Sequence, residues 1–383
     1  MKNVIIENRT LKGDFQGTSY NLRVFRFGAA KPGKPKAYMH AALHADETPG
    51  MLILHHMLPK LQAAAEAGLI EGEIVVLPQA NPLGGAQVLF GDTHIGRFDM
   101  ASGQNHNRGW ELLPPQIIAD IEAVLCDDEA TNVANIRRIM GAAVAARKPV
   151  TVLDQFRKEI LQLSHDADIV FDIHCDDESG RHLFIIPEQW PDWEDIARAS
   201  RSMVALTAAD SGGGSYDECL STVWTRLKAR FPGYPIPLAC PAATFEYAGW
   251  ADVEDDVAEE DAQHLFSVLC SRGFIDMEPT PLPDIEVPGL PLEATEMLRT
   301  DVPGILTYKV AVGDKVTKGQ HVADIIDPTE LDPAKARTPM YATTDGFILS
   351  RRTRKLMFPG ESIMKIVGKE VLESRKGGYL LED

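Results

Sequence analysis

The sequence predicts an α/β fold, in which a mixed sheet is flanked by helices, followed by a small all-β domain at the C-terminus. Strand-like and helical segments alternate over roughly the first 270 residues, which is typical of a largely parallel or mixed sheet covered on both faces. A proline-rich segment then occupies residues 277–293. Short β-rich runs separated by glycine follow it, as in small barrels and sandwiches.

The alternation is inferred from hydrophobic spacing, segment length and residue type. Strands are expected at residues 20–27, 37–43, 73–78, 167–175, 182–187 and 239–248. Helices are expected at residues 51–67, 115–125, 130–147, 151–164, 193–208, 217–230 and 254–271. Thr48 and Pro49 suit the cap and first turn of the first helix. The polar, glycine-rich residues 90–113 predict a long loop, where function often resides.

The proline-rich segment predicts a domain boundary near residue 285, which gives domains 1–285 and 286–383. Within the second domain, residues 304–326 and 346–367 form an approximate repeat, each with a β run between two glycines. The first half resembles the biotinyl/lipoyl hammerhead barrel. We therefore expect a barrel-like domain that acts as a lid or an oligomer contact.

Composition excludes several classes of partner. The 383 residues are 44% hydrophobic and 25% charged, as in ordinary globular proteins. A net charge of -18 argues against binding to nucleic acid or to an anionic membrane surface. The five scattered cysteines, none in a CxxC pair, indicate a reducing compartment. Without a signal-like apolar stretch or a segment of ~18 apolar residues, a cytoplasmic protein is expected.

Candidate metal ligands follow the ends of predicted strands. His44 and Glu47 stand three residues apart at a turn into a helix, and His174 ends the strand that contains Asp172. Imidazole and carboxylate are both zinc ligands, and catalytic zinc sites use three protein ligands plus water. Asp172, two residues earlier on the same face, can orient the imidazole of His174. Taken singly, each residue also fits a structural or solvated role.

Two further groups are candidates for binding and proton transfer. Asn107 and Arg108 lie in the long loop, where a guanidinium can grip a carboxylate in bidentate fashion, although an exposed loop arginine fits equally. Glu246 lies in an apolar strand. A buried carboxylate there needs a partner or a catalytic task, and burial would raise its pKa towards that of a base acting near neutrality.

The order of these motifs resembles the zinc carboxypeptidase superfamily, and within it the succinylglutamate desuccinylase/aspartoacylase family. The matching segments span residues 40 to 250, and they are ALHADETPG, LPQANPLG, NHNRGW, DIVFDIHCDD and ATFEYAG. The resemblance implies a zinc-carboxypeptidase-like sheet and one Zn²⁺ per chain. Members of this length often carry a small C-terminal β-domain, which agrees with the repeat.

The resemblance also implies roles for individual residues. The zinc ligands would be His44, Glu47 and His174, and the general base would be Glu246. The substrate carboxylate would be held by Asn107 and Arg108. An upstream arginine that polarises the scissile carbonyl would be Arg97, although the spacing between it and the Asn-Arg pair is irregular for the family.

The expected activity is zinc-dependent hydrolysis of an amide bond in a small N-acylated amino acid, or a related compound, that carries a carboxylate. Two alternatives stay open, namely a zinc carboxypeptidase acting on peptides and a non-catalytic metal- or ligand-binding homologue. The sequence does not identify the acyl group or the amine. A homo-oligomer is expected only because members of the resembled family commonly form one.

Overall fold

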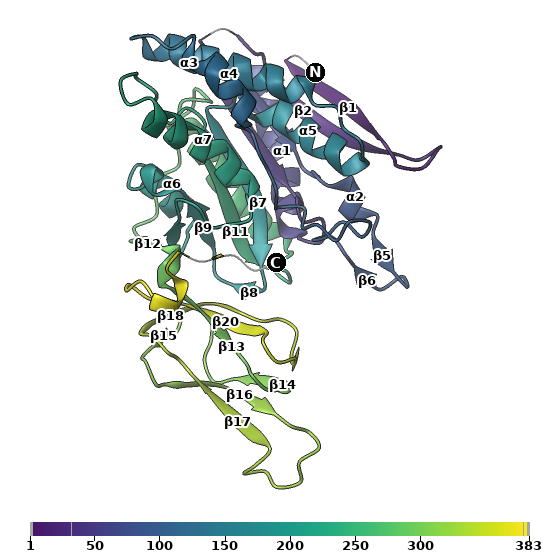
Figure 1. Cartoon of the computed structure of the whole chain (residues 1–383), viewed down its shortest axis with the longest axis vertical. Coiled ribbons are helices and arrows are strands. Elements are labelled where there is room, and N and C mark those ends of the chain that lie inside the picture. Colours follow the sequence, from purple (N-terminus) through teal and green to yellow (C-terminus); the bar gives the residue numbers. More distant parts are fainter. Residues whose placement is uncertain (1–2, 32, 378, 381–383) are drawn as a thin grey trace.

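A computed structural model describes residues 3–31, 33–377 and 379–380. Its largest element is a nine-stranded sheet (Figure 1). Across the sheet the order is β1 (Val4–Lys12), β2 (Ser19–Gly28), β4 (Glu73–Leu77), β3 (Lys36–Ala41), β7 (Ile169–Asp176), β11 (Ala242–Gly249), β9 (His182–Ile185), β10 (Ala205–Thr207) and β12 (Gly289–Pro291).

The middle of this sheet is parallel and buried. β3 pairs in parallel with both β4 and β7, and β7 pairs in parallel with β11. β2 and β9 are antiparallel to their inner neighbours β4 and β11. The predicted mixed α/β fold is therefore confirmed, and the carboxyl ends of β3, β7 and β11 share one edge, where sites form in such sheets.

Helices cover both faces of the sheet (Figure 1). One apolar core lies between the sheet and a group of helices that comprises α3 (Ile118–Glu122), α4 (Glu129–Ala146), α5 (Val152–Ser164) and α7 (Tyr216–Arg230). The core on the other face lies under α1 (Pro49–Ala67), α6 (Glu194–Ala199) and α8 (Asp255–Ser271). Within the described residues, no helix has the length and apolar character needed to cross a membrane.

Helix α1 begins as the sequence predicts, with Thr48 at the cap position and Pro49 in the first turn. It ends at Gly68, whose positive φ of 76° suits glycine. Its first turn lies close against the sheet, because a Cβ on Gly50 would be 2.8 Å from Ile173 Cγ2. This close approach brings the residues just before α1 next to the end of β7.

The C-terminal part is all-β, as predicted. One sheet contains β13 (Thr295–Arg299), β20 (Ser362–Val367), β18 (Gly346–Arg351) and β15 (Lys315–Val316). The other contains β17 (Arg337–Tyr341), β16 (His321–Ile326), β14 (Gly304–Tyr308) and β19 (Leu356–Met357). The short β8 (Glu178–Ser179), which follows β7, pairs with β18 and joins the two parts.

One expectation about local structure was wrong. The predicted helix at 193–208 ends at Ala199, and its last residues form β10, which pairs with β9 and β12. Its apolar run Val204–Leu206 fits a short buried strand as well as a helix. The predicted loop at 90–113 is confirmed over most of its length, and it contains the short strand β6 (Thr93–His94), which pairs with β5 (Val88–Leu89).

Candidate active site

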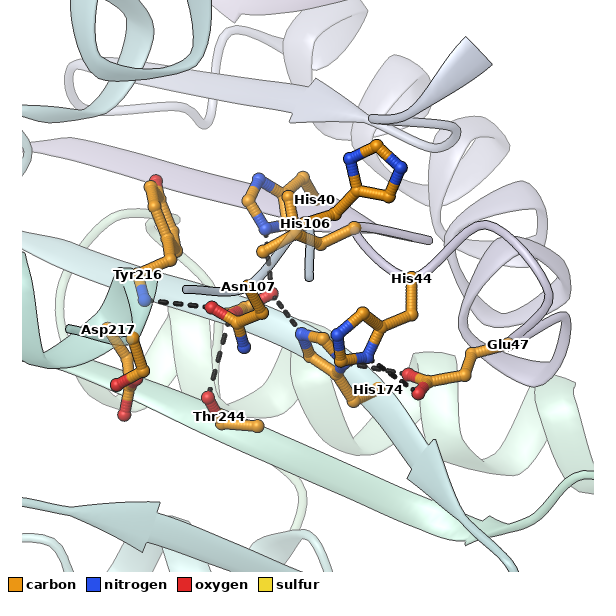
Figure 2. Close-up of polar contacts among 12 residues, drawn as sticks. His40, His44, Glu47, His106, Asn107, His174, Tyr216, Asp217 and Thr244 are labelled. Carbon is orange, nitrogen blue, oxygen red and sulfur yellow. Dashed lines mark hydrogen bonds and ion pairs between the residues drawn. The ribbon is translucent and has the colours of Figure 1, made fainter. Parts of the chain in front are cut away.

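Three buried side chains converge where β3 and β7 end. His44 follows β3, Glu47 immediately precedes the cap of α1, and His174 lies near the end of β7. Glu47 Oε1 is 2.8 Å from His44 Nδ1, and Glu47 Oε2 is 2.7 Å from His174 Nδ1. Figure 2 shows both imidazoles pointing towards this carboxylate. One potential ligand atom from each residue lies within 4.8 Å of the others.

The far nitrogen of each imidazole has its own partner. His44 Nε2 is 2.8 Å from Asn105 Oδ1, and His174 Nε2 is 2.9 Å from Asp172 Oδ1. Asp172 therefore lies within ion-pair distance of His174, although Nε2 makes no hydrogen bond to the described residues, and its orienting role stays a prediction. These acceptors favour a proton on each Nε2, so each Nδ1 can bind a metal ion once it carries no proton itself.

A buried polar chain continues behind Asp172, and sequence reasoning missed it. Asp172 Oδ1 is also 2.7 Å from His40 Nε2, and His40 Nδ1 is 2.9 Å from the Tyr38 hydroxyl. All three side chains are fully buried. Their alternation along β3 and β7 was visible in the sequence, but their pairing depends on the register between the two strands.

The electrostatics of this cluster suit a cation. Burial, followed by the charge of Arg97, lowers the pKa of His44 to about 4, so this imidazole is neutral at pH 7. Burial opposes ionisation of Glu47, but the two histidines hold the pKa of this carboxyl well below its usual range. Two imidazole nitrogens and one carboxylate are a donor set that zinc accepts. The geometry therefore fits a metal ion held by three protein ligands.

Glu246 lies on β11 beside this cluster, directly opposite His174 in the strand register. Its Oε2 atom is buried and has no hydrogen-bond partner among the residues that the structure describes. Burial, and then the negative charge of Glu47, raise the pKa of Glu246 to about 8. A partly buried carboxylate with a free oxygen and a raised proton affinity can accept a proton from a neighbouring water.

The three other predicted residues come from the long loop. Arg97 places a terminal nitrogen 3.3 Å from His44 Nδ1 and 3.4 Å from Glu47 Oε1, so it faces the metal cluster. Asn107 Oδ1 accepts a hydrogen bond of 2.8 Å from the backbone N–H of Tyr216, which directs α7 towards the site (Figure 2). Arg108 donates through Nε to the Tyr379 hydroxyl at 2.8 Å.

The metal cluster, Glu246 and the three loop residues line one cavity of about 500 Å³. The structure thus brings together every site residue predicted from the sequence, namely His44, Glu47, Arg97, Asn107, Arg108, His174 and Glu246. The cavity also reaches the C-terminal part of the chain, which contributes Thr295, Met297, Arg352, Thr353, Arg354, Lys365, Arg375 and Leu380.

Four acidic residues in the cavity wall were not predicted, namely Asp176 and Asp177 at the end of β7 and Asp217 and Glu218 on α7. Asp217 and Glu218 stand in the first turn of α7. Burial raises the pKa of Asp217 to about 6 and that of Glu218 to about 7. Ser215 donates to Asp217, and the backbone N–H of Ser211 donates to Glu218. Acidic side chains are common in a first helical turn, so the sequence carried no distinct signal for them.

Comparisons with known proteins agree with this geometry. Residues 33–112 match the model of the succinylglutamate desuccinylase/aspartoacylase catalytic domain. No curated protein matches the sequence at a significant level.

Several solved structures are similar over nearly the whole chain. One, described as a succinylglutamate desuccinylase/aspartoacylase family protein from Shewanella amazonensis SB2B, has 23% identity and a TM-score of 0.83, and the match covers 95% of this chain and 99% of that one. A similarly described protein from Shewanella frigidimarina NCIMB 400 has 22% identity and a TM-score of 0.83, over 96% and 98% of the two chains.

A more distant match is the product-bound ectoine utilization protein EutE (DoeB) from Ruegeria pomeroyi, with 16% identity, a TM-score of 0.64, and coverage of 97% and 96%. At such identities these structures establish the shared fold. The catalytic-domain match covers the segment of the chain that contains His44, Glu47 and the Asn107–Arg108 pair.

Proposed function

We propose that the protein is a zinc-dependent deacylase that hydrolyses the amide bond of a small N-acylated amino acid, or a related compound, carrying a carboxylate. One Zn²⁺ per chain would be held by His44, Glu47 and His174. The observation that carries the proposal is that this cluster, a carboxylate of raised pKa and two arginines face one cavity of about 500 Å³.

Each residue has a task in this reaction. When bound, zinc supplies a positive charge that polarises the amide carbonyl and lowers the pKa of a water molecule. Glu246 accepts the proton of the attacking water and delivers it to the leaving nitrogen. Arg97, whose guanidinium faces the cluster, donates hydrogen bonds to the oxyanion of the tetrahedral intermediate.

The substrate carboxylate is assigned to Arg108 and Asn107. A guanidinium offers the planar donor geometry that a carboxylate accepts. Because the side-chain oxygen of Asn107 is bonded to Tyr216, the NH₂ group is the part that Asn107 can offer to a ligand. Both residues line the cavity, so an anchored carboxylate would hold the amide in a fixed position relative to Glu246.

We further propose that the chain divides near residue 285 and that residues 286–383 act as a lid. Arg352, Lys365 and Leu380, all beyond this boundary, line the same cavity as the metal cluster. A cavity closed by a second domain favours a small molecule over a long peptide, so it favours a deacylase over the carboxypeptidase alternative. The cytoplasmic location and the homo-oligomer stay predictions.

The direct test is release of primary amine from a panel of N-acetyl and N-succinyl amino acids, with and without a zinc chelator. Release that stops with the chelator and returns with added zinc would support the proposal. Shortening of peptides with a free C-terminus, without turnover of the panel, would instead identify a carboxypeptidase. Zinc binding without turnover of either class would identify a binding protein.

A further inference from the structure

A row of side chains runs across the sheet from the metal centre to an apolar region. In the strand register Asp172 lies opposite Thr244, Thr244 opposite Phe184, and Phe184 opposite Leu206. Residues in register on neighbouring strands project from the same face. Adjacent strands are about 4.8 Å apart, so Leu206 lies roughly 14 Å from Asp172 along this row.

The far end of the row is covered by other apolar side chains, which we call the apolar wall and define as Phe184, Leu206, Ala208, Leu292 and Leu380. All five line the cavity that contains the metal cluster, and all belong to one hydrophobic cluster. They come from β9, from β10 and the residue that follows it, from the segment before β13 and from the last described residue. The cavity therefore has a polar end at the metal centre and an apolar end on β9 and β10.

Three of the four basic residues that the C-terminal part adds to the cavity are paired with acidic side chains, and the fourth, Arg375, donates to the backbone oxygen of Leu380 at 2.7 Å. Lys365 Nζ lies 2.6 Å from Asp176 Oδ2, and Arg352 lies 3.3 Å from Asp177 Oδ2. Arg354 is paired with Glu361.

A second carboxylate on the acyl group would lose water where it touches the apolar wall, because the five side chains of the wall carry no polar group. An acetyl group bound at the metal centre would be too short to reach it. An alkyl or aryl group extending from the amide would cover Phe184 and Leu206, and ligand pockets of 300–1,000 Å³ are mostly lined in this way.

We propose that the apolar wall binds an extended apolar group of the substrate, so that the preferred substrate is an N-acylated amino acid with a medium-length alkyl or aryl group. This inference rests on the proposed deacylase function and specifies its substrate class. The apolar group belongs either to the acyl part or to the amino acid side chain. A separate series of substrates tests each of these two positions.

The experiment measures kcat/KM on the zinc-loaded full chain with two substrate series. One series lengthens the acyl group of N-acyl-alanine from acetyl through butyryl and hexanoyl to octanoyl. The other keeps the acetyl group and lengthens the amino acid side chain from alanine to norvaline, norleucine and 2-aminooctanoate. In one series, kcat/KM should rise by up to about fourfold per methylene, the factor equivalent to ~0.8 kcal/mol per buried methylene.

A matched pair of variants then locates the effect. We define a chain-length ratio as kcat/KM for the longest substrate divided by kcat/KM for N-acetyl-alanine. Phe184→Ala should lower this ratio at least tenfold. Phe347→Ala should keep that ratio, because Phe347 packs against the same cluster but does not line the cavity.

The outcomes separate this inference from the proposed function. A rise in either series supports the inference and shows which side of the amide carries the apolar group. Turnover of the acetyl compounds with flat or falling kcat/KM in both series would overturn it and leave the deacylase function standing. Turnover of the wider panel of N-acetyl and N-succinyl amino acids without turnover of either series would also overturn the inference alone. If neither the panel nor the two series are hydrolysed, the deacylase function itself fails.

Discussion

At the scale of single residues, the site consists of two imidazoles that contact the same carboxylate through Nδ1. Each imidazole also has a polar neighbour at its Nε2 atom. Glu47 contacts Nδ1 of both His44 and His174, and Asn105 and Asp172 contact the opposite nitrogens. Because the rings are buried and their orientations fixed, the metal-binding geometry is formed before any ion binds.

Asp172→Asn should weaken zinc binding by about 10–100-fold, because the amide orients His174 without the charge that raises the basicity of the ligand. Competition with a chromogenic chelator measures this affinity. Asp168→Asn is the matched control, since Asp168 lies just before the same strand but pairs with Arg137. Equal zinc affinity in the two variants would show that Asp172 has no role in metal binding.

Zinc binding should also depend on pH. Burial opposes protonation of His174, but Asp172 and Glu47 raise the pKa of this metal-free imidazole well above 6.5. Its charged form therefore stabilises the metal-free fold fully below the unfolded-state pKa of about 6.5, and this contribution is lost as pH rises past the folded-state pKa.

Zinc competes with that proton, so zinc affinity should rise about tenfold per pH unit across the neutral range, with release of one proton. Calorimetry in buffers of different ionisation enthalpy measures the proton count. A pH-independent affinity would contradict the raised pKa.

The motifs in the sequence identified the residues that the structure gathers in the cavity, since each motif carries its chemistry in a few adjacent positions. Their roles remain predictions. The residues behind them were not identified. Asn105 lies within the NHNRGW motif, but nothing in the sequence marked it as a neighbour of His44. The contact of His40 with Asp172 depends on strand register, which local sequence does not determine.

At the scale of elements, the junction of α1 with β7 positions the metal cluster. Glu47 precedes α1, His174 lies on β7, and Gly50 lets the first turn of the helix approach Ile173. Sequence signals for this helix start were local, so its position was predicted. The helix predicted at 193–208 was wrong in its last part for the opposite reason. There the structure depends on long-range pairing of β10 with β9 and β12, which the local sequence does not reveal.

Gly50→Ala should lower the free energy of unfolding by about 1–3 kcal/mol, because the added methyl overpacks the contact with Ile173. It should also weaken zinc binding, since the turn that carries Glu47 must move. Chemical denaturation of the metal-free protein measures the first effect. Gly233→Ala, where a Cβ would meet no atom within 4 Å, is the control. Equal stability of both variants would show that the close approach is not required.

At the scale of the whole molecule, the C-terminal part docks onto the end of the strand that carries His174. Three consecutive acidic residues face three basic ones, in the pairs Asp176–Lys365, Asp177–Arg352 and Glu178–Arg351. Each pair joins residues more than 170 positions apart. The sequence predicted a separate β-domain from its repeat, but contacts at this separation leave no local pattern, so its docking face was not predictable.

The last described residues also reach the site. Leu380 N–H donates to Ser211 O at 2.9 Å, and the Tyr379 hydroxyl accepts from Arg108 Nε at 2.8 Å. Tyr379→Phe should raise KM for carboxylate-bearing substrates about tenfold, because losing a hydrogen bond to a charged group costs about 1.5 kcal/mol. Tyr234→Phe, on a side chain that does not line the cavity, is the control. An unchanged KM would show that the Tyr379 hydroxyl does not contribute to substrate binding.

The central claim is that Glu246 performs proton transfer beside a metal ion held by His44, Glu47 and His174. The most direct measurement compares turnover of a cleaved N-acyl amino acid by the wild type and by Glu246→Gln, at equal zinc content verified by elemental analysis. Glu246→Gln should retain one zinc per chain and lose about 10²–10⁴-fold in kcat. Equal turnover by the two proteins at equal zinc content would contradict the central claim.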